Sequence, residues 1–263
     1  MIIITGYKGF IGSNFHKTFD NEVILVERED CFNFINTFNE WEKVTLIIHQ
    51  GAISHTTEKN INLLHQLNVD FTLKLLQKAI DYQITIKYAS SASVYGNNTD
   101  GIVSPLNYYA ISKLQIDYFV LDNIDKFKLI QGFRYFNVYG STEYNKGNQA
   151  SPIYKFRKQI KEQGYIELFE NSENYSRDFI CINDIIQVVL TNKAKSGIYD
   201  LGTANPISFK EIANTIINSD GGYIKEIPMP DILKGKYQTY TCANMHWLDY
   251  NFKTVKQYIN NDT

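Results

Sequence analysis

The sequence has little of what marks secreted, membrane-spanning or metal-binding proteins. Only three of its 263 residues are cysteines, and Cys31, Cys181 and Cys242 are an odd, widely spaced set that lacks disulfide-framework or metal-ligand spacing. The N-terminus has the pattern of a strand rather than of a signal peptide, and the longest apolar runs are only strand-length. We therefore expect a cytoplasmic chain with no metal and no membrane-spanning segment.

Neither sign of charge dominates the chain. Lysine and arginine together number 26 against 28 aspartates and glutamates, which gives a net charge of −2, and the basic residues are scattered. Nucleic acids and anionic membrane surfaces attract clustered basic residues, so neither partner is expected. The predicted ligand is a small molecule.

The chain also lacks internal repeats and any linker rich in proline, glycine or serine. With 263 residues it is long enough for one large α/β domain with a sizeable core. Strand-like apolar runs alternate with amphipathic stretches, the pattern of βαβ units around a parallel sheet. We predict a Rossmann-type doubly wound parallel sheet that binds a dinucleotide over residues 1–150. Residues 151–263 are predicted to form mainly a smaller α/β substrate-binding lobe, interleaved with the core and not a separate folding unit.

The predicted elements are clearest in the first half of the chain. Strands are predicted at Met1–Thr5, Glu22–Glu27, Leu46–His49, Thr85–Ser90 and Lys128–Phe133, and helices over Ile61–Tyr82 and about Tyr109–Phe127. Arg28–Thr45 is short and irregular, so we expect a truncated helix there. In the second half, helices are predicted over Ser151–Gly164 and from Asp184, and strands at Ile166–Phe169 and Phe179–Ile182. The segments assigned to the smaller lobe are Gly197–Gly202, Ser208–Asn218 and Tyr223–Pro228.

Three glycines at three-residue spacing follow the first predicted strand. Gly6 permits a tight strand-to-helix turn, Gly9 lets the backbone approach a pyrophosphate, and Gly12 allows close packing of helix on sheet. Glu27, at the end of the next strand, can accept hydrogen bonds from an adenosine ribose, whereas Arg28 beside it suits a 2′-phosphate. The sequence therefore predicts a bound dinucleotide, either NAD or NADP.

A tyrosine and a lysine stand one helical turn apart further along the chain. Tyr109 and Lys113 are at positions i and i+4, so they share one helix face. An ammonium beside a phenol favours the phenolate, which a tyrosine with a pKa near ~10 needs if it is to act as a base at neutral pH. Upstream, Ser91 closes a strand where its hydroxyl can bond a substrate oxygen. Each piece also occurs by chance, but their order after the glycine turn favours hydride-transfer chemistry.

Several segments, in order along the chain, carry a resemblance to one known family. They are His49–Glu58, Tyr88–Gly96, Gly132–Gly140, Lys146–Gly147, Leu168–Phe179 and Ile227–Gln238. They resemble the nucleotide-sugar epimerases and dehydratases of the extended short-chain dehydrogenase/reductase family. Within it they are most similar to the branch that acts on ADP-heptoses.

The resemblance implies an isomerase that oxidises and then reduces C6 of an ADP-heptose or a related nucleotide sugar, with a tightly bound nicotinamide cofactor. It implies Tyr109 and Lys113 as the catalytic pair, Ser91 as the polarising hydroxyl, and Lys146 as a second acid/base on the opposite side of the carbon. Inversion by oxidation and reduction needs a proton donor and acceptor for either face of the ketone, which two bases provide. A plain loop lysine is the alternative for Lys146. A homo-oligomer is also implied.

The resemblance further implies two sets of ligand-binding residues. Besides the glycine turn, Glu27 and Arg28, the cofactor set contains Phe10, Ile11, Gln50, Gly51, Ala52, Ile53, Ser54, Asn68, Tyr109, Lys113, Val138 and Lys146. The substrate set contains Ser91, Asn137, Asn148, Phe169, Glu170, Asn171, Ser172, Arg177 and Tyr237. Arg177 also has a reason of its own, because a guanidinium binds a diphosphate through two hydrogen bonds; a salt bridge with Asp178 is the alternative.

The chain departs from the family pattern in ways that leave choices open. It is shorter than usual after Glu27, where the family has basic residues that hold the adenosine end of NADP, so NAD and NADP both remain candidates. Gln50 stands where the family commonly has glutamate. A 4-epimerase or a reductase on another nucleotide sugar remains an alternative. A dehydratase is disfavoured because Ala92 and Ser93, not acid/base carboxylates, follow Ser91. A dinucleotide-binding sensor would need the glycine turn but not the four predicted catalytic residues.

Overall fold

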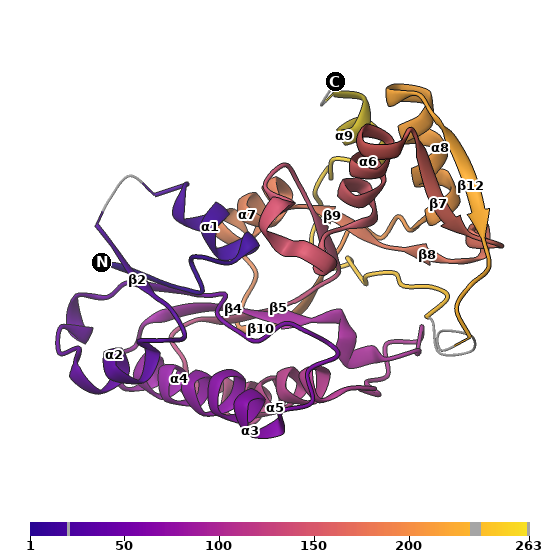
Figure 1. Cartoon of the computed structure of the whole chain (residues 1–263). Helices are drawn as coiled ribbons and strands as arrows, with labels where there is room; N and C mark the ends of the chain where they lie inside the picture. The colour runs from indigo at the N-terminus through magenta and orange to yellow at the C-terminus, as the bar shows by residue number, and fades with distance from the viewer. Residues whose placement is uncertain (20–21, 232–237, 262–263) are drawn as a thin grey trace. The chain divides into compact units, whose positions relative to one another are not determined.

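A computed structural model describes residues 1–19, 22–231 and 238–261 of the chain (Figure 1). The chain divides into two compact units, and each is built from several separate stretches of sequence. The first consists of Met1–Gly96, Val103–Tyr135 and Val188–Asp200, and the second of Asn97–Ile102, Phe136–Gln187 and Leu201–Thr263.

A six-stranded sheet with the order β10-β5-β4-β3-β1-β2 is the framework of the first unit. Its strands are β1 (Ile2–Thr5), β2 (Val23–Val26), β3 (Leu46–His49), β4 (Thr85–Ser91), β5 (Ile130–Tyr135) and β10 (Gly197–Leu201). The strands from β1 to β5 pair in parallel. Helices cover both faces of such a sheet, which is why its strands are nearly continuous apolar runs. The predicted α/β class with a Rossmann-type parallel sheet is confirmed.

The crossover helices of the first unit supply the rest of its core. They are α1 (Phe10–His16), α2 (Cys31–Thr37), α3 (Ile61–Leu64), α4 (Phe71–Asp81) and α5 (Tyr108–Asp122). Figure 1 shows α2, α4 and α5 on one face of the sheet and α1 on the other. The short α2 agrees with the truncated helix expected there. A π-helical segment, His65–Asp70, interrupts the long helix predicted over Ile61–Tyr82 and joins α3 to α4.

One segment lies in a different place from the one predicted. Gly197–Gly202 was assigned to the smaller lobe, but Gly197–Leu201 forms β10, the edge strand beside β5 in the central sheet. A five-residue edge strand has the same apolar pattern in whichever sheet it pairs. Its partner is distant in sequence, so the local pattern does not identify it.

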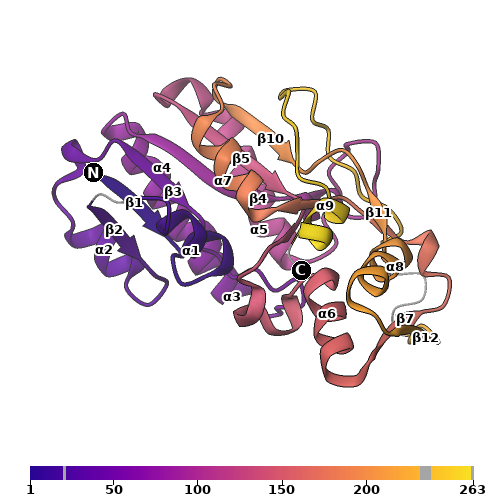
Figure 2. The ribbon, with the colours of Figure 1, turned by 90° about the horizontal axis from the view of Figure 1, so that it is seen from above.

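The second unit consists of three two-stranded ladders with helices packed on them. The ladders pair β6 (Asn137–Tyr139) with β9 (Phe179–Cys181), β7 (Tyr165–Phe169) with β12 (Tyr223–Ile227), and β8 (Ser176–Arg177) with β11 (Ile207–Ser208). Its helices are α6 (Pro152–Gln163), α8 (Phe209–Asp220), α9 (Val255–Asn261) and most of α7 (Ile182–Thr191). Figure 2 shows α6 and α8 beside β7 and β12. Within the described ranges no helix combines the length and apolar character that crossing a bilayer requires.

His49, the last residue of β3, is buried among hydroxyl groups. Its Nδ1 lies 2.6 Å from Thr5 Oγ1 and its Nε2 lies 2.9 Å from Thr72 Oγ1. Burial, and to a lesser extent the charge of Lys113, lowers the pKa of His49 to about 3. An unfolded histidine has a pKa of about 6.5, so below that pH the unfolded chain binds a proton that the folded chain does not.

His49→Gln is therefore expected to flatten the loss of stability in acid. In the wild type this residue removes up to about 1.4 kcal/mol of unfolding free energy per pH unit as pH falls from about 6.5 towards 3. Urea unfolding between about pH 7 and pH 5 measures the slope. His246→Gln, which replaces an exposed histidine, is the matched control for the substitution itself. Equal slopes in all three proteins would contradict the prediction.

Candidate active site

The predicted dinucleotide turn joins β1 to α1. Gly6 has a φ of +70°, and a Cβ there would lie 2.6 Å from the backbone of Gly51. A Cβ on Gly12 would lie 2.1 Å from the Gly6 carbonyl oxygen, whereas one on Gly9 would lie 3.3 Å from the same oxygen. Gly6 and Gly12 are thus required by the packing of the turn itself. The exposed Gly9 is not, which is consistent with a role in letting a ligand approach the backbone.

Glu27 and Arg28 differ in how they are held. The Lys8 N–H, inside the glycine turn, donates a 2.6 Å hydrogen bond to Glu27 Oε1. The Glu27 carboxylate is thereby fixed beside the turn, where a group that accepts hydrogen bonds from the adenosine ribose is expected. Arg28 instead pairs with Glu29, Nε to Oε1 3.0 Å, with 65% of its side chain exposed. The structure brings Glu27 to the turn and leaves Arg28 in a surface ion pair.

The loop after β3 contains the predicted cofactor residues Gln50 to Ser54. Asn68, from the π-helical segment, holds this loop: its Oδ1 accepts from the Ile53 N–H at 2.7 Å and its Nδ2 donates to the Ile53 carbonyl at 3.0 Å. Asn68 Nδ2 also donates to Ser112 Oγ of α5 at 3.0 Å. A helix interrupted by a π turn often marks a functional site. These contacts place Asn68 against the loop, and cofactor binding by both stays a prediction.

Two polar side chains beside this loop have no hydrogen-bond partner among the described residues other than each other. They are the amide of Gln50 and the hydroxyl of Tyr135, the last residue of β5. An unsatisfied buried polar group costs about 1–3 kcal/mol, so a polar ligand that bonds it is favoured. Together with the glycine turn and Glu27, these groups fit a dinucleotide. The sequence analysis did not select Tyr135, because the surroundings of its hydroxyl are known only from the folded chain.

The start of α5 presents the predicted catalytic pair. Asn107 caps the helix, and its side chain accepts from the Ala110 N–H at 2.9 Å. An asparagine at this position fixes the first turn, so Tyr109 and Lys113 lie on one face of the helix. The helix therefore begins where the predicted chemistry needs it.

Ser91 and Tyr109 meet at the carboxyl end of β4. The two side chains are hydrogen-bonded; burial raises the pKa of the Tyr109 phenol, and the bond with Ser91 lowers it in part. Ser91 Oγ also accepts from Ser93 Oγ at 2.9 Å. The structure thus unites the predicted serine and tyrosine in one hydrogen-bonded pair.

Lys113 completes this cluster from within the unit. It is 5% exposed, and its Nζ donates to the Ala89 carbonyl of β4 at 2.8 Å. Burial lowers the pKa of Lys113 to about 8, against the opposing effect of the Asp117 carboxylate. An amine with a pKa near neutrality is able to hold or release a proton under working conditions.

Asp117, one turn after Lys113, organises the polar groups behind it. It is fully buried and accepts from Tyr88 Oη, Ser90 Oγ and Arg134 Nε, each at 2.9 Å. These bonds fix the end of β4 against α5. The sequence analysis did not select Asp117, although its position four residues after Lys113 on the same helix face was a signal.

In the second unit, Lys146 and Val138 lie together as expected. Lys146 is in the 3₁₀ segment Glu143–Gln149, and its Nζ donates to the Val138 carbonyl at 3.2 Å and to Glu143 Oε2 at 3.1 Å. Glu143 was not among the predicted residues. Lys146 is therefore held by buried groups, as an acid/base residue requires.

Most of the predicted substrate residues also lie in the second unit. Asn137 opens β6 and its side chain is exposed, and Asn148 accepts through its carbonyl from Lys155 Nζ at 2.7 Å. Phe169, Glu170, Asn171 and Ser172 form the turn after β7, where Asn171 has a φ of +60° and the buried Ser172 hydroxyl has no partner among the described residues. Tyr237 lies outside the described residues.

Arg177 is held by backbone carbonyls in β8. Its guanidinium donates to the carbonyls of Ser176, at 2.9 Å, and Gln238, and it lies over the ring of Phe209 at 5.6 Å. The neighbouring Asp178 accepts from three backbone N–H groups and the Thr203 hydroxyl. The carbonyl bonds orient the guanidinium, a group whose planar set of donors suits a diphosphate.

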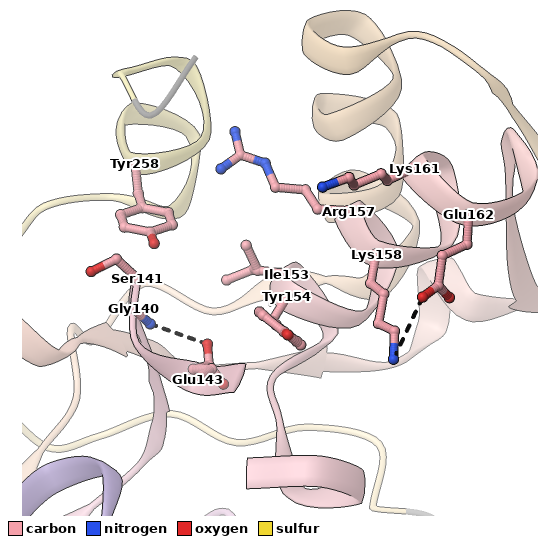
Figure 3. A pocket seen from close by; sticks show the side chains of 10 residues that line it. All are labelled: Gly140, Ser141, Glu143, Ile153, Tyr154, Arg157, Lys158, Lys161, Glu162 and Tyr258. Carbon is pink, nitrogen blue, oxygen red and sulfur yellow. Dashed lines mark hydrogen bonds and ion pairs between the residues drawn. The ribbon is translucent and has the colours of Figure 1, made fainter. Parts of the chain in front are cut away.

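A cavity of about 620 Å³ lies elsewhere in the second unit (Figure 3). Its lining consists of Gly140, Ser141, Glu143, Ile153, Tyr154, Arg157, Lys158, Lys161, Glu162 and Tyr258. Arg157 Nε lies 3.1 Å from Asp220 Oδ2 and Lys158 Nζ lies 3.7 Å from Glu162 Oε1, so part of the positive charge is balanced within the unit. We assign the cavity no ligand.

Comparison with known proteins gives consistent matches along the chain. Residues 2–202 match the NAD dependent epimerase/dehydratase family. The ADP-L-glycero-D-manno-heptose-6-epimerase of Brachyspira hyodysenteriae is 38% identical, covering 93% of this chain and 89% of that protein. The crystal structure of the Helicobacter pylori ADP-L-glycero-D-manno-heptose-6-epimerase has 30% identity and a TM-score of 0.84, covering 99% of this chain and 94% of that one. The Thermus thermophilus UDP-glucose 4-epimerase complex with NAD, 20% identical, shares the fold with a TM-score of 0.78 over 98% and 96% of the two chains.

Proposed function

The chain belongs to the NAD-dependent epimerase/dehydratase family, and we propose that it converts ADP-D-glycero-D-manno-heptose into ADP-L-glycero-D-manno-heptose with NAD or NADP. The observation that carries the substrate assignment is the 38% identity to a heptose epimerase over 93% of the chain. The hydrogen-bonded Ser91 and Tyr109, with Lys113 on the same helix face, support the chemistry. A homo-oligomeric state and a cytoplasmic location stay predictions.

The first unit is proposed to bind the cofactor and to carry one acid/base group. When bound, the nicotinamide accepts hydride from C6 of the heptose and later returns it. Tyr109 Oη takes the proton of the C6 hydroxyl, and the Ser91 hydroxyl donates a hydrogen bond to the same oxygen. The Lys113 ammonium favours the Tyr109 phenolate that this step requires.

The second unit is proposed to bind the nucleotide sugar and to carry the other acid/base group. Arg177 meets the diphosphate with its guanidinium. After the ketone turns its other face, Lys146 Nζ donates the proton to the ketone oxygen as the opposite C6 configuration forms. Tyr109 then releases the proton it took to solvent, and Lys146 takes one from solvent, so both groups return to their starting states. Because the cofactor ends each cycle in its starting state, a tightly bound dinucleotide serves many turnovers.

Two neighbouring residues, Glu27 and Arg28, favour different cofactors, NAD and NADP respectively. Glu27, fixed by the Lys8 N–H, suits the free ribose hydroxyls of NAD. Arg28 suits the 2′-phosphate of NADP once it leaves its surface pair with Glu29. Extraction of the purified protein followed by mass spectrometry identifies the dinucleotide that it retains.

The assignment is tested by incubating the purified protein with ADP-D-glycero-D-manno-heptose, without added reduced cofactor, and following the C6 proton by NMR. We expect the L-glycero epimer to appear. The second candidate function is that of a 4-epimerase, because the Thermus thermophilus UDP-glucose 4-epimerase shares the fold. UDP-galactose is the matched substrate that tests it. Conversion of UDP-galactose with an unchanged heptose would overturn the substrate assignment and leave the epimerase chemistry in place.

A further inference from the structure

Glu143 is a buried carboxylate in the segment that carries Lys146. It is 1% exposed, whereas most of the other residues in its short 3₁₀ segment, Glu143–Gln149, are exposed to solvent. A buried carboxylate is costly unless hydrogen bonds or an opposite charge compensate it. Its partners therefore show what it does.

Four donors from three places in the chain converge on this carboxylate. Glu143 Oε1 accepts from the Gly140 N–H at 3.1 Å, drawn in Figure 3, and from Ser151 Oγ at 2.7 Å. Glu143 Oε2 accepts from the Ser151 N–H at 2.6 Å and from Lys146 Nζ at 3.1 Å. The carboxylate thus ties the end of β6, the start of α6 and the lysine together.

The three neutral donors and the ammonium have different consequences. The bonds to Gly140 and Ser151 fix the place of the carboxylate, because they come from backbone and from a helix cap. The fixed carboxylate then restricts Lys146, a long side chain that loses up to about 2 kcal/mol of rotamer entropy when ordered.

A second lysine shows that positive charge gathers here. Lys155, one turn into α6, has its pKa lowered by burial first and then by the charge of Lys146, with Glu143 opposing. Two ammonium groups near one carboxylate make that carboxylate the local counter-charge. Without it, the two positive charges would face each other with no negative charge between them.

We propose that Glu143 is a positioning residue that holds Lys146 in place as the acid/base group for one face of the ketone. The proposal rests on the proposed function, because that function gives Lys146 its catalytic role. Glu143 itself contacts neither substrate nor cofactor in this account. It acts through Lys146 alone.

The first test compares the two epimers in single-turnover experiments that follow the absorbance of the reduced nicotinamide. Lys146→Met identifies the epimer whose oxidation depends on Lys146. Glu143→Gln, which keeps the shape and removes the charge, is then expected to slow that epimer about 10-fold to 100-fold in rate, with little change in KM. The other epimer should stay within about threefold. Glu143→Asp, which restores the charge, should recover part of the rate.

A matched buried carboxylate separates positioning from stability. Asp184 in the same unit is 7% exposed and accepts from Tyr250 Oη at 3.1 Å and from the Lys253 N–H at 2.9 Å. Asp184→Asn should slow both epimers equally, if at all. Equal slowing of both epimers by Glu143→Gln, or no slowing, would overturn the proposal.

A second measurement needs no substrate and keeps the two proposals distinguishable. Reductive methylation of the protein, read by peptide mass spectrometry, reports how readily each lysine amine reacts. Glu143→Gln should raise the rate at Lys146 at least about threefold relative to Lys161, because the amine loses the charged hydrogen bond that holds it. An unchanged ratio overturns the coupling of Glu143 to Lys146. A raised ratio in a protein that leaves ADP-heptose unchanged supports the coupling and overturns the proposed function.

Discussion

Tyr109→Phe is expected to lower turnover of the ADP-heptose by about 10²-fold to 10⁴-fold while the dinucleotide stays bound, the usual range for loss of a general base. The substitution removes only the hydroxyl that bonds Ser91 at the end of β4. The ring, the capped start of α5 and Lys113 remain, so the cofactor surface is nearly unchanged. Initial rates by NMR give the loss in turnover, and the dinucleotide extracted per protein chain gives the occupancy.

The chain offers a matched control one residue away. Tyr108 is on the same helix, but 46% of its surface is exposed, and Tyr108→Phe removes a hydroxyl from that exposed side chain. Its activity should stay within about twofold of wild type, as for most surface changes. If both variants were equally active, Tyr109 would not be the base. If both lost activity equally, the effect would be structural.

The parts of this fold that the sequence predicts well depend on near neighbours. The apolar run Leu46–His49 is a strand with the predicted bounds, and the strand predicted over Thr85–Ser90 extends one residue further, to Ser91. Ser151, Pro152 and Gly164 bound α6 as cap, first residue and left-handed end, which the residue types indicate directly. The Tyr109 and Lys113 pairing follows in the same way from helical spacing.

The parts that it does not predict depend on residues brought together from far along the chain. β10 (Gly197–Leu201) pairs with β5 (Ile130–Tyr135), a strand distant in sequence, so its apolar pattern did not reveal its sheet. Glu143 looks like an ordinary loop glutamate until Gly140 and Ser151 enclose it. Gln50 and Tyr135, whose side chains have no partner among the described residues other than each other, become visible only when the sheet edge is assembled, because an absent bond has no sequence signal.

The three glycines of the opening turn differ in what they contribute, and substitution should separate them. Gly12→Ala places a Cβ 2.1 Å from the Gly6 carbonyl oxygen, backbone against backbone, where no side chain is able to move aside. We expect a loss of about 3 kcal/mol or more in unfolding free energy, at the upper end of overpacking effects. Urea unfolding of the protein stripped of dinucleotide measures this loss.

Gly9→Ala is the matched variant, and it should lower dinucleotide affinity while leaving the stability of the fold nearly unchanged. Gly9 has φ −72° and ψ 165°, a conformation that alanine adopts, and its Cβ would lie 3.3 Å from the Gly6 oxygen. Stability should therefore stay within about 1 kcal/mol of wild type. Dinucleotide affinity, by titration calorimetry, should fall about 10-fold or more because the methyl group stands where the backbone must approach the pyrophosphate. Unchanged affinity in a stable Gly9→Ala protein would show that the dinucleotide does not approach the turn at Gly9.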